Sequence, residues 1–589
     1  MITNTELEYK GDLYPSNIVD FKKDVDSVYF YTDNSVILKV TVLRDSLIRF
    51  RYTTKGYFSK DFSYAIDKTQ SHGYNFLEVI EEKERYKIKT SKVICAIDKV
   101  DLRVAITDLE GQCILEDELG FHWEESYHFG GNIVKMSKAS KEGECFYGMG
   151  DKASHANLKG KRVENWATDQ YAFHKDQEPL YKVVPFYIGL QNKQAYGIFF
   201  DNTFKTTFDF CHEKRNVTSY WADGGEMNYY FIYGPQMQDV VTTYTHLTGK
   251  PELPPLWALG YHQCKWSYYP ESKVKEVTSK FRELQIPCDA IYLDIDYMDG
   301  FRCFTWNKEY FPDPKRMVAE LAEDGFKTVV IIDPGIKIDK EYWVYKEALE
   351  KDYFCKRADG PYMKGKVWPG ECNFPDYTNP EVREWWAGLF KELISDFGVK
   401  GVWNDMNEPA VMEVPGKTFP MDVRHDYDGN PCSHRKAHNI YGTQMARATY
   451  EGVKQFAYPK RPFIITRSAY SGAQRYTSSW TGDNVASWEH LWIANIQMQR
   501  MSISGMGFTG SDIGGFAEQP SGELYARWIQ LGVFHPFCRT HSSGDHGDQE
   551  PWSFDVDVIN ITRKFVQLRY QLLPYLYTMF WEYINDGVP

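Results

Sequence analysis

The segment GVWNDMNEPA at residues 401–410 places a group of polar side chains at the end of an apolar strand. Val402 and Trp403 are typical of a buried strand, and two amides and two carboxylates follow at once: Asn404, Asp405, Asn407 and Glu408. Carboxylates in such a position can bind a divalent cation, transfer protons or attack an electrophilic carbon. Which of these roles applies depends on the residues that the fold brings close to this strand end.

Most other apolar strands in the second half of the chain also end in polar or aromatic residues. These residues are Trp266, Asp294, Asp296, Asp333, Arg467, Asp483, Asp512 and His541. A purely structural distribution would place polar residues at both ends of the strands, whereas here they gather at the carboxyl ends. Since the carboxyl ends of parallel barrel strands meet on one face, we expect an active site there.

Two kinds of chemistry fit such a ring of carboxylates. Asp294 and Asp296 could bind a divalent metal ion, but no His-x-x-x-His pair or acid-rich loop supports that interpretation. The same pair could instead bind two neighbouring hydroxyls of a sugar. Cleavage of a glycosidic bond needs one ionised and one protonated carboxyl, and Asp405 and Asp483 could face each other across the barrel mouth.

Aromatic and polar residues near the same strand ends could bind a sugar ring. Trp266, Trp368 and Trp480 offer flat apolar walls, and Arg467 and His541 could bind hydroxyls. Taken singly, each Trp is more typical of core packing and His541 of a structural role. Their joint occurrence favours a carbohydrate site.

The elements that must position these residues repeat as apolar strands alternating with helical stretches. Eight candidate strands cover residues 256–266, 290–298, 327–335, 399–409, 461–470, 476–484, 503–512 and 533–542. This pattern predicts an α/β catalytic domain over 251–589, a (β/α)8 TIM barrel with insertions after strands three and four, at about 336–378 and 410–437. The interval between strands five and six is too short for a full helix, so an irregular connection is expected there.

The first part of the chain follows a different rhythm. Residues 25 to about 235 return to short β-branched or alternating runs such as SVILKVTVL and YYFIYG, separated by Asn, Asp and Gly. This pattern predicts an antiparallel β-sandwich over residues 1–250. The Pro-rich segment 249–260 marks the boundary.

Composition excludes several classes of protein. The net charge is −13 and no long Lys/Arg run occurs, which argues against nucleic-acid binding. No stretch of 18 apolar residues predicts a membrane span. The 11 Cys are scattered without a Cys-x-x-Cys motif, and no signal sequence is evident, so we expect reduced thiols and a cytoplasmic location. A signal removed earlier would leave no trace.

Ten long motifs make the chain similar to glycoside hydrolase family 31, the α-glucosidase family. The resemblance covers about 145–589 and is strongest from 254 on. Its motifs are LDIDYMDGFRCFTW (293–306), GKVWPG (365–370), FPDYTNP (374–380), VWNDMNEP (402–409), HNIYG (438–442), TRSAYSGAQRY (466–476), WTGDN (480–484), GSDIGGF (510–516), LGVFHPFCRTH (531–541) and LLPYLYT (572–578).

The resemblance implies roles for individual residues. Asp405 would be the nucleophile, Asp483 the acid/base, and Asp294 would bind hydroxyls at the non-reducing end of the glucose. Asp169 would reach the substrate from a loop of the sandwich (165–173), and Asp512 would orient its neighbours. The remaining substrate-binding residues would be Trp266, Ile336, Trp368, Met406, Arg467, Trp480, Phe516 and His541. The loop GMGDK (148–152) departs from the family by an Asp where relatives carry Glu, outside the expected chemistry.

The resemblance therefore implies a retaining, exo-acting α-glucosidase that needs no cofactor or metal. Its partners would be α-glucosides and oligosaccharides, with homo-oligomerisation possible. Alternatives are an α-glucosyltransferase, an α-xylosidase or α-galactosidase, or a non-catalytic sugar-binding protein, which would be expected to lack one catalytic acid. The C-terminal β-domains of relatives are expected to be absent, since the sequence ends in what resembles the last barrel helix.

Overall fold

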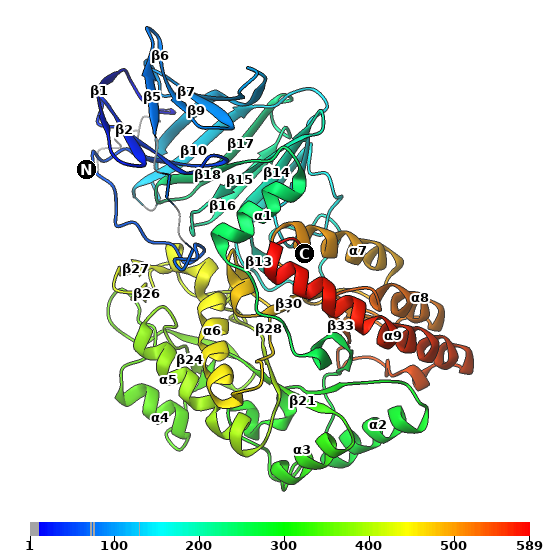
Figure 1. The fold of residues 1–589 in the computed structure, drawn as a ribbon. Coiled ribbons are helices and arrows are strands. Elements are labelled where there is room, and N and C mark those ends of the chain that lie inside the picture. Colours follow the sequence, from blue (N-terminus) through cyan, green and yellow to red (C-terminus); the bar gives the residue numbers. More distant parts are fainter. Residues whose placement is uncertain (1–10, 71–72, 75–76, 129) are drawn as a thin grey trace, which may run out of the picture.

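The computed structural model describes residues 11–70, 73–74, 77–128 and 130–589, and these form a β-rich part and a barrel part. Figure 1 shows the N-terminal strands, blue to green, stacked above the barrel, whose helices run from green to red. Among the helices of this described part, none combines the length and apolar character that a bilayer crossing needs.

The N-terminal part consists of two antiparallel sheets. One contains, in order, β1 (Ile18–Lys23), β2 (Ser27–Thr32), β3 (Ile37–Arg44), β4 (Leu47–Thr53), β18 (Met227–Tyr233), β15 (Gln194–Phe200), β14 (Phe186–Gln191) and β11 (Cys145–Gly148). The other contains β12 (Lys161–Asn165), β16 (Thr206–Phe210), β17 (Val217–Ala222), β10 (Asn132–Ala139), β9 (Cys113–Glu125), β8 (Val104–Asp108), β7 (Val93–Asp98), β6 (Arg85–Lys89) and β5 (Glu78–Glu81). Inward-facing residues such as Val40, Phe50 and Ile106 share one core, and the predicted antiparallel sandwich is confirmed.

The second part is a parallel barrel. Its strands are β19 (Tyr261–Gln263), β20 (Ala290–Leu293), β21 (Lys327–Ile332), β25 (Gly401–Asn404), β28 (Ile464–Thr466), β30 (Ser478–Trp480), β31 (Thr509–Gly510), β32 (Asp512–Ile513) and β33 (Cys538–Thr540). β31 pairs with β30 and β32 with β33, while β33 pairs with β19. Because β31 and β32 are two halves of one segment interrupted at Ser511, the nine strands of the sheet occupy eight barrel positions, as predicted.

The seventh barrel segment lies unusually close to its neighbour. A Cβ on Gly510 would lie 2.2 Å from the backbone carbonyl oxygen of Phe537, so only glycine fits there. This close approach brings the next residues, including Asp512, into the barrel wall beside β33.

Helices and insertions surround the barrel. α1 (Met237–Thr248) instead packs on β14, β15 and β18 of the sandwich. The helices of the barrel part are α2 (Glu271–Glu283), α3 (Pro314–Glu323), α4 (Trp343–Glu350), α5 (Pro380–Lys391), α6 (His434–Ala457), α7 (Trp488–Ile503), α8 (Gly522–Gly532) and α9 (Val556–Asp586). Between β28 and β30 the described chain forms β29 (Ala469–Tyr470) and one 3-10 turn (Ala473–Arg475), which confirms the predicted irregular connection. The insertion after β21 contains β22 (Ile336–Lys337), α4, β23 (Lys364–Val367) and β24 (Gly370–Asn373), and that after β25 contains β26 (Arg424–His425) and β27 (Cys432–Ser433).

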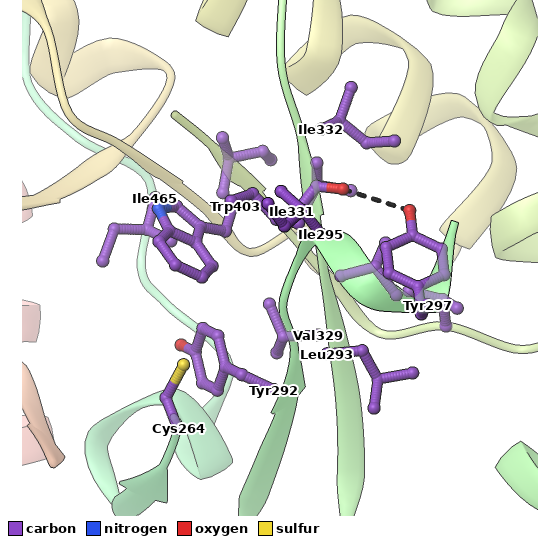
Figure 2. Close-up of a cluster of buried hydrophobic side chains, with 14 of the residues drawn as sticks. Cys264, Tyr292, Leu293, Ile295, Tyr297, Val329, Ile331, Ile332, Trp403 and Ile465 are labelled. Carbon is purple, nitrogen blue, oxygen red and sulfur yellow. Dashed lines mark hydrogen bonds between the residues drawn. The ribbon is translucent and has the colours of Figure 1, made fainter. Parts of the chain in front are cut away.

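Apolar side chains fill much of the barrel interior. Figure 2 shows Tyr292, Ile331, Trp403 and Ile465 packed together, and Tyr297 donates a hydrogen bond of 3.0 Å to the Ile331 carbonyl. Strands buried on both faces are expected to be largely apolar, and Ala290–Leu293 and the last four residues of Lys327–Ile332 follow this rule. Deep in the barrel, the buried polar residues Arg539 and Asp512 are paired with each other.

The sandwich is tied to the barrel through buried polar contacts. β13 (Lys182–Val183) pairs in parallel with β29. Asp151 accepts hydrogen bonds from Lys182 at 3.0 Å and from Gln497 of α7 at 2.9 Å. The Asp that departs from the family pattern therefore contributes to the junction of the two parts.

Candidate active site

A cavity of about 710 Å³ opens at the carboxyl ends of the barrel strands. The structure brings ten of the predicted site residues together in its wall: Asp169, Trp266, Asp294, Trp368, Asp405, Met406, Arg467, Asp483, Phe516 and His541. They come from many different strands and from the sandwich, so the tertiary fold alone makes them neighbours.

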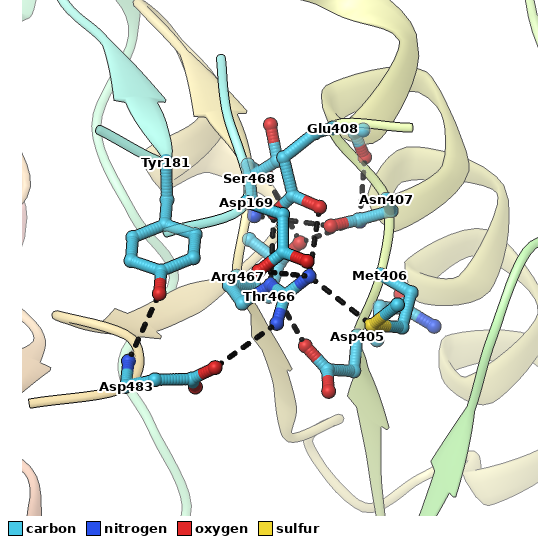
Figure 3. A network of polar contacts seen from close by, with 12 residues as sticks. Asp169, Tyr181, Asp405, Met406, Asn407, Glu408, Thr466, Arg467, Ser468 and Asp483 are labelled. Carbon is cyan, nitrogen blue, oxygen red and sulfur yellow. Dashed lines mark hydrogen bonds and ion pairs between the residues drawn. The ribbon is translucent and has the colours of Figure 1, made fainter. Parts of the chain in front are cut away.

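Asp405 and Asp483 face the same guanidinium group. Asp405 follows β25, and its Oδ1 lies 3.0 Å from Arg467 Nε, without the angle of a hydrogen bond. Asp483 follows β30, and its Oδ2 lies 3.7 Å from Arg467 Nη1. Figure 3 shows both carboxylates pointing toward Arg467 from opposite sides of the cavity.

Arg467 is held in place mainly by Glu408. Its Nε and Nη2 donate to the two carboxylate oxygens of Glu408 at 2.9 Å each, and Glu408 is 1% exposed. Such a bidentate pair fixes both the position and the plane of the guanidinium. Nη2 also lies 3.5 Å from Asp169.

The other polar residues of the 401–410 segment hold the turn that presents Asp405. Asn407 donates to Thr466 Oγ1 at 2.9 Å and accepts from the Ser468 amide at 3.0 Å. Asn404 donates to the Ile332 carbonyl at 3.3 Å. These bonds, with the Glu408–Arg467 pair, connect three neighbouring strand ends, so the carboxylate of Asp405 has a fixed orientation.

Burial and nearby charges affect the pKa values of Asp483 and Asp405 to different extents. Burial raises the pKa of Asp483 well above its ordinary value, and the nearby carboxylates of Asp169 and Asp405 raise it further against the opposing Arg467. Burial also raises the pKa of Asp405, but Arg467 at 3.0 Å and the Met406 amide stabilise its anion. The proton shared within this cluster therefore favours Asp483.

Asp294 and His541 form the far end of the cavity. The Ile295 amide donates to Asp294 Oδ1 at 2.7 Å, and His541 Nε2 lies 4.0 Å from Asp294 Oδ2. Burial, together with Arg539, lowers the pKa of His541 well below its ordinary value, so the ring is neutral and can both donate and accept. Both side chains suit the hydroxyls of a sugar.

Apolar side chains line the walls between these polar groups. Trp266 and Trp368 meet with ring centroids 5.1 Å apart at 61°, and Phe516 packs against His541 at 4.9 Å. The wall also contains Asp296, which the sequence analysis placed at a strand end, and residues that we did not expect: Tyr171, Ile295, Ile331, Trp403 and Asp545. Period two along a strand could have identified Trp403 beside Asp405 and Ile331 beside Asp333.

Three of the predicted site residues lie outside the cavity wall in this structure, and their roles stay predictions. Ile336 is fully buried in β22, which pairs with β24 of the insertion, and Ile331 lies in the wall instead. Trp480 is 1% exposed and packs edge-on against Trp403 at 5.7 Å, below the cavity. Asp512 is fully buried and accepts from Arg539 at 2.8 Å, which leaves it the orienting role but not contact with a ligand.

The sandwich loop reaches the cavity as predicted. Asp169 and Tyr171 line the rim, and Lys417 Nζ donates to the Asp169 carbonyl at 2.8 Å. Tyr181, from the same part of the chain, accepts from the Asp483 amide at 3.2 Å and lies under Arg467, whose guanidinium is 5.1 Å from the ring centre. The loop therefore contacts both sides of the carboxylate pair.

By spacing, Cys264, Asp294 and His541 could together hold a metal ion at the inner end. Burial, however, raises the pKa of the Cys264 thiol well above its ordinary value, so the thiol remains protonated and is a poor ligand. Asp294 and His541 line the cavity and can form hydrogen bonds with hydroxyls, whereas Cys264 is not part of its wall.

A barrel mouth with an anionic carboxylate, a protonated carboxyl and aromatic walls defines the class of glycosidases that act through paired acids. Comparison with known proteins gives the family. The model of the glycosyl hydrolases family 31 TIM-barrel domain matches residues 251–579, and that of the family 31 N-terminal galactose mutarotase-like domain matches 37–209. The chain belongs to glycosyl hydrolase family 31.

Individual relatives support this assignment. The chain is 41% identical to Alpha-glucosidase 2 of Bacillus thermoamyloliquefaciens, over 96% of this chain and 71% of the relative. It is 37% identical to human Neutral alpha-glucosidase C, over 79% of this chain but 54% of the relative. The solved Flavobacterium johnsoniae GH31 dextranase complexed with glucose superposes with a TM-score of 0.91 at 31% identity, over 98% of this chain and 71% of that one.

Proposed function

We propose that this chain is a retaining, exo-acting α-glucosidase that removes terminal α-linked glucose from oligosaccharides. The observation that carries the proposal is that Asp405 and Asp483 share Arg467, while burial raises the pKa of Asp483 well above its ordinary value and Arg467 and the Met406 amide counter the smaller rise at Asp405. Relatives named alpha-glucosidase at 41% and 37% identity support the same activity.

In the first step, Asp405 attacks the anomeric carbon of the terminal glucose. The glycosidic C–O bond breaks as Asp483 transfers its proton to the leaving oxygen, and a β-glycosyl ester of Asp405 forms. The ion pair with Arg467 keeps Asp405 anionic and aimed, and burial keeps the proton on Asp483 until the leaving oxygen takes it.

In the second step, water replaces the leaving group. Asp483, now ionised, takes a proton from the water, whose oxygen attacks the anomeric carbon and displaces the Asp405 carboxylate. Two inversions leave the product with the α configuration, and both carboxyls return to their starting protonation states.

The shape of the cavity supports exo action. Trp403 and the Asp512–Arg539 pair close the barrel below, and Asp294 and His541 lie at the inner end where they can bind the hydroxyls of one terminal sugar. Asp169 and Tyr171 lie at the rim, on the side expected for the leaving-group sugar.

A panel of α-1,4-, α-1,6- and α-1,3-linked glucose disaccharides tests the proposal through release of glucose. Product NMR should show α-glucose first, before mutarotation. Initial release of β-glucose would refute the retaining mechanism, and release of xylose or galactose from matched α-glycosides in place of glucose would refute the substrate. Longer oligosaccharides as the main products would identify a transglycosylase.

The cysteines support a location in a reducing compartment such as the cytoplasm. All the cysteines, from Cys95 to Cys538, are free thiols in the described structure. Reduced thiols without a disulfide framework are usual for cytoplasmic proteins. Thiol titration of the denatured protein, purified without reductant, should find all 11 reactive; paired thiols would contradict this location.

A further inference from the structure

The HNIYG motif supplies two buried residues that the proposed reaction does not use. His438 and Asn439 lie on α6 and are fully buried. His438 Nε2 lies 2.7 Å from the Ala167 carbonyl oxygen, and Asn439 Oδ1 accepts from the Ala167 amide at 3.0 Å. Ala167 is two residues before Asp169, so both contacts fix the sandwich loop where it enters the active site.

His438 is also the last member of a row of three buried histidines. His438 Nδ1 lies 2.9 Å from His434 Nε2, and His434 Nδ1 lies 3.0 Å from His425 Nε2. His425 Nδ1 lies 3.0 Å from Asp376 Oδ1. The row joins the two barrel insertions to α6 and, through Ala167, to the sandwich; Figure 1 shows β26 and β27 beside α6 on the side toward the sandwich.

The two ends of this row determine how many protons it holds. The Ala167 carbonyl can only accept, and Asp376 also accepts from Thr378 Oγ1 at 2.7 Å and the Asp426 amide at 2.7 Å, so it acts as a carboxylate. Each of the four contacts between these ends needs one proton, whereas three neutral imidazoles supply only three. The row must therefore carry one additional proton, balanced by the charge of Asp376.

Thr418 allows one other arrangement, which the distances disfavour. Its hydroxyl lies 3.3 Å from His434 Nε2 and 3.2 Å from His438 Nδ1 and could donate to both. Three neutral rings would then suffice, but the two ring nitrogens would face each other as lone pairs at 2.9 Å. Two acceptors at that separation repel each other, which favours a proton between them.

The electrostatic surroundings place the additional charge at the Asp376 end. Burial lowers the pKa of His434 well below its ordinary value and that of His438 to about 3, so these rings are neutral. Burial opposes ionisation of Asp376, yet His425 and the Thr378 and Asp426 hydrogen bonds outweigh it and lower its pKa. Cys355, Cys432 and Tyr441 also lie near this end, and burial raises the pKa of each, so they add no charge.

We propose that Asp376, His425, His434 and His438 form a proton-sharing chain, here called the histidine chain, that fixes Ala167 and thereby holds Asp169 at the active site. The four are positioning residues, because the described contacts reach the cavity only through the loop. Trp166 stacks on His438 with ring centroids 3.7 Å apart, so the same residue clamps the loop by its ring face and its ring nitrogen. The role for Asp169 rests on the proposed function, whereas the proton count does not.

The proton count can be tested without activity, by NMR of protein with ¹⁵N-labelled histidine rings. At about pH 8.5, two units above the ordinary histidine pKa, exposed rings are neutral. We expect one doubly protonated ring to remain in the wild type and to disappear in Asp376→Asn, whose amide can donate to His425 and satisfy a neutral chain. Absence of that ring in the wild type, or its persistence in Asp376→Asn, would overturn the proton-sharing chain.

The link to Asp169 can be tested with a double-mutant cycle. His438→Phe keeps a ring to stack on Trp166 but cannot donate, and it should lower kcat/KM on maltose by about 10- to 100-fold through misplacement of the loop. Asp169→Asn should then cost much less in the His438→Phe background than in the wild type. Equal losses in both backgrounds would overturn the positioning role.

Two further variants separate positioning from general damage. His438→Gln retains an N–H group for the Ala167 carbonyl and should recover part of the lost kcat/KM. His535→Phe makes the same exchange of rings at another buried histidine, outside the histidine chain, and should leave the Asp169→Asn cost at its wild-type value. Failure of the wild type to cleave any α-glucoside would refute the proposed function but leave the NMR result interpretable.

Discussion

Two buried arginines at different depths of the barrel differ in the number of carboxyl groups around them. Arg539, in the floor, pairs with Asp512 alone at 2.8 Å and is surrounded by the rings of Tyr292, Trp403 and Trp480. Arg467, at the mouth, lies within 4 Å of four carboxyls: Asp169, Asp405, Glu408 and Asp483. The floor is a balanced ion pair, whereas the mouth holds more acids than cations.

This difference separates a structural pair from a reactive one. One carboxylate beside one guanidinium, surrounded by aromatic rings, stays ionised and does not exchange protons. Four carboxyls around one guanidinium cannot all be ionised at low cost, so one must bind a proton near neutral pH. Burial raises the pKa of Asp483 well above its ordinary value, so the mouth holds its proton where the proposed acid is needed.

Removing the nucleophile should produce the largest effect. Asp405→Ala leaves no carboxylate placed to form the covalent ester, so kcat should fall by about 10⁴- to 10⁶-fold. Because one member of a crowded group of acids is lost, the melting temperature should not fall. Steady-state kinetics and calorimetry check both results, and activity within tenfold of wild type would refute the assignment.

The floor pair should respond in the opposite way. Asp512→Asn leaves Arg539 buried without a counter-ion, which should cost about 3–5 kcal/mol of unfolding free energy. Denaturant unfolding measures this loss, while the kcat of the protein that remains folded should change far less than in Asp405→Ala. A large loss of kcat with unchanged stability would show that the floor pair takes part in the chemistry.

Weakening the ion pair between Glu408 and Arg467 should give a smaller effect on rate. Glu408→Gln keeps one hydrogen-bond acceptor for Arg467 but removes a charge, so the guanidinium should move toward Asp405 and weaken the nucleophile. We expect kcat/KM to fall by about 10- to 100-fold. Asp313→Asn, at the exposed cap of α3, is a matched acid-to-amide control that should leave kcat/KM unchanged.

The smallest effect concerns the dependence of stability on pH. The pKa of Asp483 is higher in the folded protein than in the unfolded chain. Its contribution to the free energy of unfolding is therefore fully present below the unfolded-state pKa and is lost as the pH rises through the folded-state pKa. Asp483→Asn should therefore flatten the fall in melting temperature on going from acid to neutral pH. An unchanged slope would mean that Asp483 is already ionised at acid pH.

Residues at strand ends were predictable because the strand pattern itself locates them. Asp405, Asp483 and Asp294 follow apolar runs, and a parallel barrel brings such ends to one face. Trp403 and Ile331 were missed although period two along their strands points them toward the same side as Asp405 and Asp333. Ile336 lies outside the cavity wall because the barrel strand ends at Ile332 and the chain then enters the insertion, which the sequence does not show.

The histidine chain was beyond sequence reasoning for a physical reason. Asp376, His425 and His434 come from two insertions and a helix, and only the packing of those segments makes them neighbours. The His438 contact with Ala167 spans 271 positions. No periodicity connects such residues, so a structure was needed to find them.

The most direct test of the account concerns the proton on Asp483. Asp483→Ala should lose kcat/KM steeply on maltose, whose leaving sugar needs protonation, and much less on an aryl glucoside, whose phenolate leaves unaided. Added azide should restore turnover of the aryl glucoside and yield the α-glucosyl azide, because azide displaces the Asp405 carboxylate from the glycosyl-enzyme.

The anomer of the azide adduct shows which of the two carboxyls has been removed. The glycosyl-enzyme is a β ester of Asp405, and azide displaces that carboxylate with inversion. The β-glucosyl azide would instead form in Asp405→Ala, where azide replaces the missing nucleophile on the α-glucoside. The decisive measurement is therefore the anomer of the azide adduct from Asp483→Ala and an aryl α-glucoside, read by NMR. The account predicts α-glucosyl azide with restored turnover, and a β adduct, or equal loss on both substrates without any adduct, would contradict it.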